Sequence, residues 1–188
     1  MDKLWEKKAI RTKIRQSIAG LSYEEMERQS AAACEKLIGN KSFAEAKTVL
    51  VYSAVRGECD PARIADAAAK MGKRVAYPKC CGDDLALYIA DQSQLSIGAY
   101  GILEPIQGCQ RIDISEVDFA VIPGMAFDRH GGRLGRGKGY YDRLLKDANA
   151  VKAGLCFNEQ LLEKVPMEPH DGRMDMIAAE KWDILLIK

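Results

Sequence analysis

The chain has 188 residues, of which 47% are hydrophobic and 29% are charged, and its formal net charge is +1. This size and composition are typical of one globular domain, spanning residues 1–188, that needs neither disulfides nor a structural metal to fold. A nearly balanced charge gives no general attraction to nucleic acid or to an anionic membrane, and no apolar run approaches the ~20 residues of a membrane span.

The cysteines and histidines limit the chemistry further. The six cysteines form no C-x-x-C pair, and Cys80 and Cys81 are adjacent, so a bond between them would be strained. No zinc-ligand spacing occurs, and the charged N-terminus lacks the apolar core of a signal peptide. We therefore expect reduced thiols in a cytoplasmic protein, with a catalytic Cys–His pair as an alternative.

Helices and strands are expected to alternate along the chain. Residues 4–18 have apolar residues at helical spacing, and Ser22 with Glu25 forms a capping box for a second helix that ends near Gly39. A further helix is expected at 61–72 and a mostly irregular segment at 91–118. Short apolar runs predict strands at 48–53, 74–78, 85–90, 119–122, 152–157 and 183–187.

This alternation predicts an α/β fold with a mainly parallel sheet. Ligands of open α/β sheets bind beyond the carboxyl ends of the strands. The segments that follow the strands at 48–53, 119–122 and 152–157 are therefore the candidate sites.

Residues 131–145, GGRLGRGKGYYDRLL, contain five glycines and four cations. Two known phosphate-loop patterns fail here. A Walker A loop needs Ser or Thr after the lysine to bind Mg²⁺, but Gly139 stands there. The dinucleotide pattern G-x-G-x-x-G begins at Gly135 and fails at Tyr140.

The ingredients of a phosphate site are nevertheless present. Glycines let backbone N–H groups approach an anion closely, and Arg133, Arg136 and Lys138 add positive charge. A strand precedes the segment, and a helix starting near Tyr140 would direct its N-terminus at the same anion. We expect a phosphate-binding loop; an ordinary turn with solvated charges is the alternative.

Acidic residues near the candidate sites have two interpretations each. Asp60 is expected to cap the helix at Pro61, whereas Glu58 is free to bind a polar ligand. Asp142 lies where an acid favours the helix dipole, but beside phosphates it would serve as a Mg²⁺ ligand. Asp171 and Asp175 follow His170. They lie either in a solvated loop, or one of them is a second acid that binds the same cation as Asp142.

Basic and aromatic residues are equally open to two interpretations. Lys7, Arg11 and Arg15 share one helix face, which is either solvated or placed over phosphates. Tyrosines can stack on a planar heterocycle, although packing is their commoner role. The candidates are Tyr52, Tyr100, Tyr140 and Tyr141.

The run from Pro123 to Leu145, PGMAFDRHGGRLGRGKGYYDRLL, closely resembles the signature of the 5-formyltetrahydrofolate cyclo-ligase family. The resemblance extends to Lys7 and Arg11 in the first helix and to Glu58 after the first strand. It also includes the stretch from Tyr100 to Pro105, YGILEP, and the late pattern of His170, Asp171 and Asp175.

The resemblance implies an enzyme that uses ATP as co-substrate and Mg²⁺ as cofactor to close a ring in 5-formyltetrahydrofolate, with or without a polyglutamate tail. ATP would phosphorylate the formyl oxygen, N10 would attack the activated carbon, and 5,10-methenyltetrahydrofolate, ADP and phosphate would be released. We expect a monomer or a weak homodimer with no nucleic-acid or membrane partner.

The resemblance also implies that the domain is a three-layer α/β/α sandwich, and it implies roles for individual residues. Arg136 and Lys138 would be catalytic, Asp142 and Asp175 would bind the metal with Asp171 as the competing ligand, and Tyr52, Glu58, Tyr100 and Tyr140 would bind the folate. The residues expected to bind ATP are Lys7, Arg11, Arg133, Leu134, Gly135, Arg136, Gly137, Lys138, Gly139, Tyr140 and Tyr141. A non-catalytic nucleotide- or folate-binding protein and another small phosphotransferase are the alternative functions.

Overall fold

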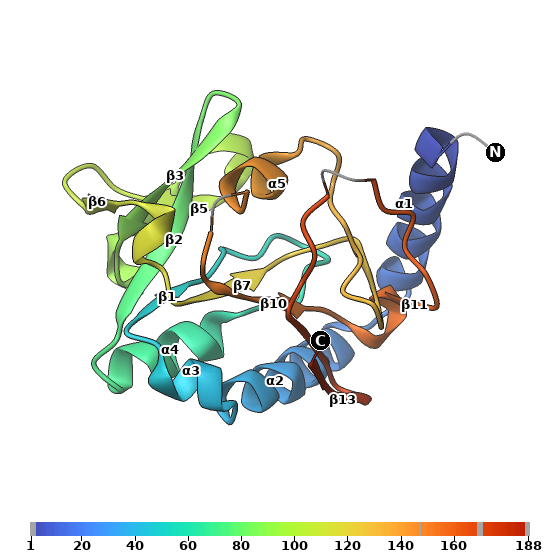
Figure 1. Cartoon of the computed structure of the whole chain (residues 1–188), viewed down its shortest axis with the longest axis horizontal. Helices are drawn as coiled ribbons and strands as arrows, with labels where there is room; N and C mark the ends of the chain where they lie inside the picture. Colours follow the sequence, from blue (N-terminus) through green and yellow to red (C-terminus); the bar gives the residue numbers. More distant parts are fainter. Residues whose placement is uncertain (1–2, 147, 169–170, 187–188) are drawn as a thin grey trace.

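A twisted β-sheet runs through the centre of the chain in the computed structural model, which describes residues 3–146, 148–168 and 171–186 (Figure 1). Within these residues the large sheet has eight strands in the order β13-β12-β10-β7-β1-β2-β3-β6. The pairs between β12 and β2 are parallel, and β13, β3 and β6 are antiparallel to their neighbours. The predicted α/β fold with a mainly parallel sheet is confirmed.

The strands of the large sheet are, in chain order, β1 (Thr48–Leu50), β2 (Arg74–Cys81), β3 (Asp84–Ile89), β6 (Gln110–Ile112), β7 (Phe119–Ile122), β10 (Val151–Leu155), β12 (Met176–Ala179) and β13 (Trp182–Leu186). The smaller sheets contain β4 (Leu95–Ile97) with β5 (Leu103–Pro105), and β8 (Ala126–Asp128) with β9 (Arg133–Leu134) and β11 (Leu161–Leu162). The helices are α1 (Lys3–Ala19), α2 (Tyr23–Ile38), α3 (Lys41–Glu45), α4 (Ala62–Lys70) and α5 (Tyr140–Leu144).

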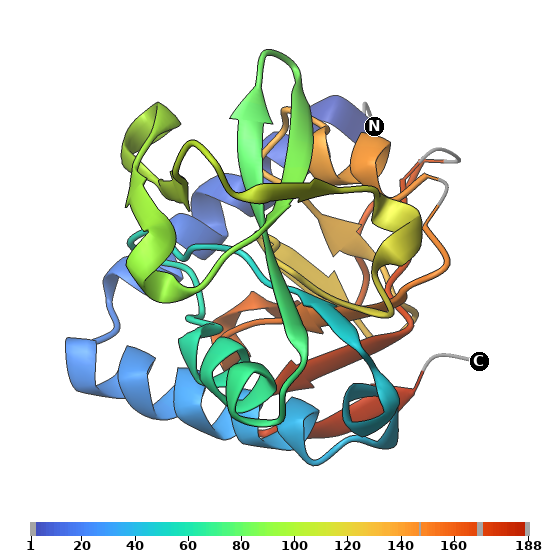
Figure 2. The same ribbon diagram turned by 90° about the vertical axis from the view of Figure 1, so that its left-hand side faces the viewer.

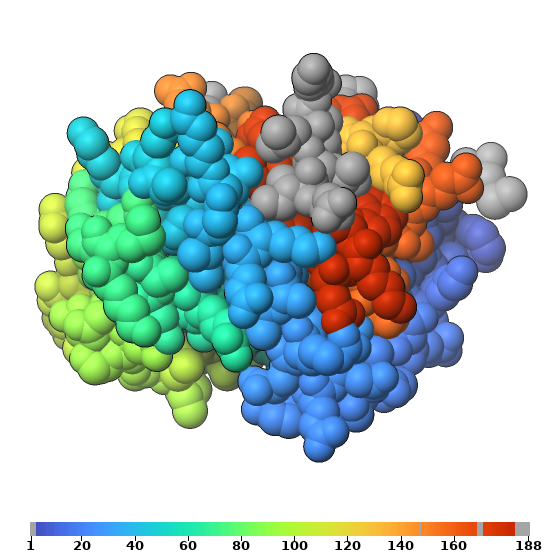
Figure 3. Space-filling view, turned by 90° about the horizontal axis from the view of Figure 1, so that it is seen from below, coloured from blue at the N-terminus to red at the C-terminus, as the bar shows by residue number. Residues whose placement is uncertain are grey.

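Both faces of the sheet are buried, which explains why its central strands are continuous apolar runs. Successive strand residues point to opposite faces. Val49 and Val121 therefore lie in the core that includes residues of α2, α3 and α4, whereas Leu50 and Ile122 lie in a second core. Figure 3 views the first helical layer from outside, with α2 and α3 in blue and cyan beside α4 in green.

The other face has a thinner cover. The short α5, its C-cap residue Leu145 and Phe127 of β8 pack there, while the long β2–β3 hairpin rises above the sheet (Figure 2). Among the residues that the structure describes, no helix combines the length and apolar character needed to cross a membrane.

Several local predictions are confirmed. Ser22 Oγ accepts from Glu25 N–H, and the Glu25 carboxylate accepts from Ser22 N–H. Asp60 Oδ1 accepts from the N–H of Ala62, the first residue of α4, at 2.9 Å, although the N-cap position itself is held by Pro61. All six cysteines lie within the described residues and are free thiols.

Other boundaries differ from the expectation. β1 ends at Leu50, so Tyr52 and Ser53 lie beyond the strand. The segment 91–118 contains β4, β5 and β6, which are too short and too polar to show a clear alternation. α5 starts at Tyr140 as expected but has only five residues.

Phe127 fits between two glycines. A Cβ atom added to Gly124 or Gly154 would lie 2.6 Å from its ring carbons, which is closer than atoms can pack without displacement. The missing side chains allow β8 to lie against the ends of β7 and β10. Phe127 itself is fully buried.

We therefore expect Gly154→Ala to lower the free energy of unfolding by about 1–3 kcal/mol, because it overpacks this contact. Urea unfolding measures the change. Gly39→Ala is the matched control, since Gly39 has a helical φ of −75° and a Cβ atom there meets nothing closer than 3.5 Å. Equal stability of Gly154→Ala and the wild type would contradict the proposed fit.

Candidate active site

A cavity of about 400 Å³ opens beyond the carboxyl ends of β1 and β7. These two strands are neighbours in the sheet, and the chain adds β2 and β3 on one side of them and β10 and β12 on the other. The order of strands thus reverses between β1 and β7. This is the switch point at which open α/β sheets bind their ligands.

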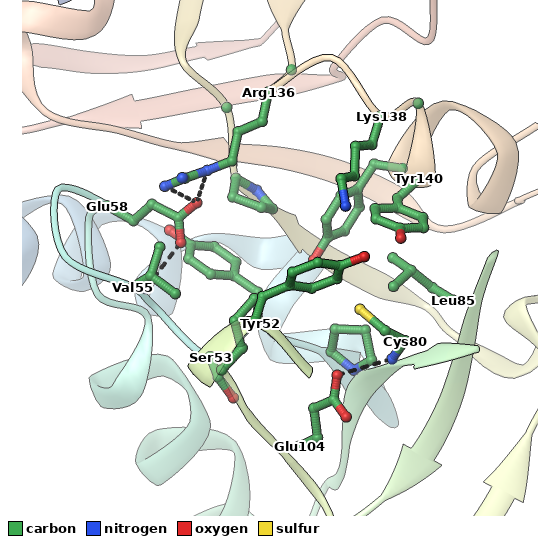
Figure 4. A pocket seen from close by; sticks show the side chains of 18 of the residues that line it. Tyr52, Ser53, Val55, Glu58, Cys80, Leu85, Glu104, Arg136, Lys138 and Tyr140 are labelled. Atoms are coloured by element: carbon green, nitrogen blue, oxygen red, sulfur yellow. Dashed lines mark hydrogen bonds and ion pairs between the residues drawn. The ribbon is translucent and has the colours of Figure 1, made fainter. Parts of the chain in front are cut away.

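The residues that follow β1 and β7 line one part of the cavity, and four other segments complete its walls (Figure 4). Tyr52 to Glu58 follow β1, and Pro123 with Gly124 follows β7. The β2–β3 hairpin, the β4–β5 hairpin, the glycine-rich loop and α5 contribute the remaining lining residues. The segment after β10 supports the wall from outside, since Gln160 Nε2 donates to Gly124 O at 2.7 Å.

Asp128 shapes the start of the glycine-rich segment. Its buried carboxylate accepts hydrogen bonds from the N–H groups of His130, Gly132 and Val165 at 2.7–2.8 Å. A Cβ atom at Gly132 would lie 2.4 Å from Asp128 Oδ2, so only glycine fits there. Gly137 and Gly139 have φ values of 109° and 68°, a backbone conformation that glycine adopts without strain.

Arg133 lies under the loop and is buried. Its guanidinium donates to Asp142 Oδ1 at 2.5 Å and to Pro123 O at 3.2 Å, and its Nε has no hydrogen-bond partner among the described residues. Burial raises the pKa of the neighbouring Tyr141, whose ring lies 5.8 Å from the guanidinium carbon. Arg133 thus connects the end of β7 to α5.

Arg136 and Glu58 meet at one end of the cavity. Arg136 Nε and Nη2 both lie 2.8 Å from Glu58 Oε1, and Glu58 Oε2 accepts from Val55 N–H at 3.1 Å. The structure therefore brings together a residue expected to act on phosphate and one expected to bind folate. Both oxygens of Glu58 have a partner in this arrangement.

Lys138 lies beside two tyrosines. Its Nζ is 3.8 Å from the centre of the Tyr100 ring and 5.7 Å from that of Tyr140. A hydrogen bond with Tyr100 raises the pKa of Lys138, so the ammonium group stays charged at neutral pH. Tyr100 has an unusual φ of 58°, and the Tyr140 hydroxyl donates to Gly82 O.

Helix α1 reaches the same loop through its basic face. Arg11 Nε donates to Gly135 O at 2.9 Å. Lys7 is buried and donates to Glu168 and Asp171, each at 2.7 Å. Burial lowers the pKa of Lys7, but the hydrogen bonds to these two carboxylates outweigh it and leave the pKa raised.

Two of the predicted site residues are engaged in the protein interior. Leu134 is buried in the first core. The Tyr52 hydroxyl, although Tyr52 lines the cavity, donates to Cys59 O, and burial raises its pKa. His170 lies outside the described residues.

Asp142 and Asp175 do not come together. Asp142 lines the cavity at the carboxyl ends of the strands. Asp175 lies at their amino ends, just before β12, and accepts from Lys152 N–H at 2.7 Å. Within the described part of the chain, no group of three or more His, Cys, Asp or Glu side chains could hold a metal ion. Of these two acids, only Asp142 lines the cavity, and a single carboxylate can bind Mg²⁺ when phosphate oxygens and water supply the other ligands.

Two residues that shape the site were not predicted from the sequence. Asp128 and Glu104 are both buried, and both stand in stretches that carry the family resemblance. Their acidity within apolar surroundings was the available signal. Glu104 lies in the cavity wall and accepts from Cys80 N–H at 3.1 Å.

The cavity at the switch point and the cationic glycine-rich loop define an α/β protein that can bind an anionic group beside a larger organic ligand. A sequence model of the 5-formyltetrahydrofolate cyclo-ligase family matches residues 4–180. The chain therefore belongs to this family.

Similar proteins are spread over distant organisms. The chain is 31% identical to the Caenorhabditis elegans "Probable 5-formyltetrahydrofolate cyclo-ligase", with 95% of this chain and 96% of the relative covered. It is 31% identical to the Escherichia coli K12 5-formyltetrahydrofolate cyclo-ligase, with 84% and 91% covered. The solved structure of Aquifex aeolicus 5,10-methenyltetrahydrofolate synthetase superposes with a TM-score of 0.87 at 35% identity, covering 97% of this chain and 93% of that one.

The ion pair of the buried Arg133 with the partly exposed Asp142 yields a prediction about stability. We expect Arg133→Met to lower the free energy of unfolding by about 1–3 kcal/mol, because it leaves the Asp142 carboxylate without its partner. The double variant Arg133→Met/Asp142→Leu should lose less than the sum of the two single changes. Urea unfolding of all three variants measures the coupling.

The control for this experiment is Arg74→Met, which breaks the exposed pair with Glu116 and should cost only about 0–1 kcal/mol. If Arg133→Met is as stable as Arg74→Met, Arg133 does not join β7 to α5 in the way described.

Proposed function

We propose that this chain is a 5-formyltetrahydrofolate cyclo-ligase that converts 5-formyltetrahydrofolate to 5,10-methenyltetrahydrofolate with consumption of ATP. Its family membership supports the substrate and product. The observation that carries the ATP dependence is the glycine-rich loop with Arg136 and Lys138 in the wall of one cavity. The volume of that cavity is within the range of pockets for drug-sized ligands.

The proposed reaction has two steps. The oxygen of the N5-formyl group attacks the γ-phosphorus of ATP. The bond between that phosphorus and the β–γ bridging oxygen breaks, which releases ADP. N10 then attacks the activated carbon, the carbon–oxygen bond breaks with phosphate as leaving group, and N10 loses its proton. Phosphorylation is needed because the formyl oxygen would otherwise have to leave as a poor leaving group.

The side chains contribute mainly position and charge, on which phosphoryl transfer depends. Loop N–H groups, Arg136 and Lys138 would bind the transferred phosphoryl group. Arg11 already contacts the loop at Gly135 O, so it would add positive charge. Lys7, one turn away, would bind phosphate by exchanging its present carboxylate partners, Glu168 and Asp171, for the ligand. The rings of Tyr100 and Tyr140 would pack against the folate.

Mg²⁺, held by phosphate oxygens and by Asp142, would neutralise charge on the phosphates. Asp142 Oδ1 is bound by Arg133, and a carboxylate can accept through its second oxygen as well. Arg133 would therefore orient the metal ligand. We further propose that the protein works in the cytoplasm as a monomer or weak homodimer, on folate with or without a polyglutamate tail, and without a nucleic-acid or membrane partner.

An absorbance assay tests this function. Purified protein is mixed with 5-formyltetrahydrofolate, Mg²⁺ and ATP, and the near-ultraviolet band of the methenyl product is followed beside an ATP-free sample. Growth of the band only with ATP supports the proposal. A flat trace from folded protein that binds ATP would support a binding protein or a different phosphotransferase.

In the same assay we expect Lys138→Ala to lower kcat at least tenfold, because the variant loses a cation that would neutralise charge on the phosphoryl group. The matched control is Lys146→Ala, which removes an exposed cation just after α5 and outside the cavity. Normal ATP-dependent turnover by Lys138→Ala would exclude the assigned role.

Magnesium titrations compare the two candidate ligands. Asp142→Asn should require at least several-fold more Mg²⁺ for half-maximal rate, since it removes a carboxylate beside the phosphates. Asp175→Asn should titrate as the wild type does, because Asp175 lies at the amino ends of the strands. A shift for Asp175→Asn alone would reverse the assignment.

A further inference from the structure

Glu104 is a buried carboxylate in the wall of the cavity. Glu104 is only 5% exposed, and it lines the same cavity as Arg136 and Lys138. Among the residues that the structure describes, no ion pair joins Glu104 to a cation. Acidic side chains are rarely buried without a partner, so an unpaired one beside a cavity indicates that a ligand supplies the missing donors.

The hydrogen bonds of Glu104 leave part of its capacity unused. Glu104 Oε1 accepts from Cys80 N–H at 3.1 Å. Burial is the main cause that raises the pKa of the Cys80 thiol, and a hydrogen bond with Glu104 raises it further. In that bond the thiol donates to the carboxylate. A carboxylate can accept about four hydrogen bonds, so about two remain for a ligand.

The surroundings hold the carboxylate in one position. A Cβ atom at Gly98 would lie 2.3 Å from Glu104 Oε2, so the absence of a side chain there makes room for the carboxylate. Lys79 Nζ donates to Pro105 O at 2.8 Å and ties β5 to β2. Such a preorganised acceptor selects among ligands by the direction of their donors.

Figure 4 shows Glu104 and Cys80 at the end of the drawn cavity opposite Arg136. At the Arg136 end the cation is paired with Glu58, whereas at the other end Glu104 has no ion pair with any described residue. Glu58, the other carboxylate considered for folate, lies at the Arg136 end, where both of its oxygens already accept hydrogen bonds.

We propose that Glu104 determines specificity by accepting hydrogen bonds from the donor edge of the pteridine ring, its 2-amino group and adjacent ring N–H. This orientation places the ring at the β4–β5 hairpin and directs the formyl group toward Arg136 and Lys138. The proposal rests on the proposed function and names the residue that orients the substrate of that reaction.

The test measures binding without ATP by calorimetry, with two ligands. One is 5-formyltetrahydrofolate, and the other is its 2-desamino-2-methyl analogue, which lacks the amino donor. We expect the wild type to bind the analogue at least tenfold more weakly than the parent. Glu104→Gln should bind the parent at least tenfold more weakly than the wild type does and should no longer distinguish the two ligands.

Turnover gives a second readout. Glu104→Gln should raise KM for 5-formyltetrahydrofolate at least tenfold and leave KM for ATP within twofold of the wild type. A merely structural role would affect both substrates. Glu116→Gln is the matched control, since it makes the same change in a carboxylate that lies outside the cavity, and it should keep the ligand preference.

Glu58→Gln tests the alternative that Glu58, and not Glu104, binds the donor edge of the pteridine ring. If Glu104→Gln keeps the preference for the parent ligand, or if the preference disappears in Glu58→Gln instead, the proposal is wrong. If thermal melting shows that Glu104→Gln does not fold, Gly98→Ala replaces it. The added methyl group would displace the carboxylate, so affinity for the parent should fall, and unchanged affinity in folded Gly98→Ala would also overturn the proposal.

The two proposals fail separately. Absence of ATP-dependent product with wild-type protein would contradict the proposed function. Product formation together with an unchanged ligand preference in Glu104→Gln would contradict only the role of Glu104.

Discussion

The buried carboxylate of Asp128 is the constraint on which the glycine-rich segment depends. Three backbone N–H groups from two separate segments converge on it. A buried carboxylate with three such donors needs no cation nearby to be stabilised. Its neighbour Phe127 is fixed equally firmly, because Gly124 and Gly154 leave space for the ring. The loop that follows therefore starts from a defined position and direction.

From this anchor, the chain passes directly into β9 and then along the cavity. Arg133 fixes the next part of the loop, because it joins Pro123 O after β7 to Asp142 in α5. The more exposed cations, Arg136 and Lys138, extend from a segment that is fixed at both ends. Positions of this kind suit phosphoryl transfer, which depends on charges held in place before the reaction begins.

The opposite wall of the cavity is built on a different principle. The β4–β5 hairpin has three-residue strands and exposed apolar side chains, including Ile97 and Leu103. It nevertheless holds Glu104 in a buried position. The proposed role of Glu104 would thus place an acceptor for ligand N–H groups in the same cavity as the cations of the glycine-rich loop.

The α/β class, the strands at the sheet centre, the cap of α2 and the glycine-rich loop could all be predicted from the sequence. These features follow from local rules of periodicity, capping and backbone freedom. The sequence did not predict that Glu58 pairs with Arg136, that Asp175 lies away from Asp142, or that Glu104 faces the cavity, because these relations depend on how the strands are ordered in the sheet. Strand order sets which loops meet, and spacing along the chain carries no record of that order, so the partners of a charged side chain become known only when the sheet is assembled.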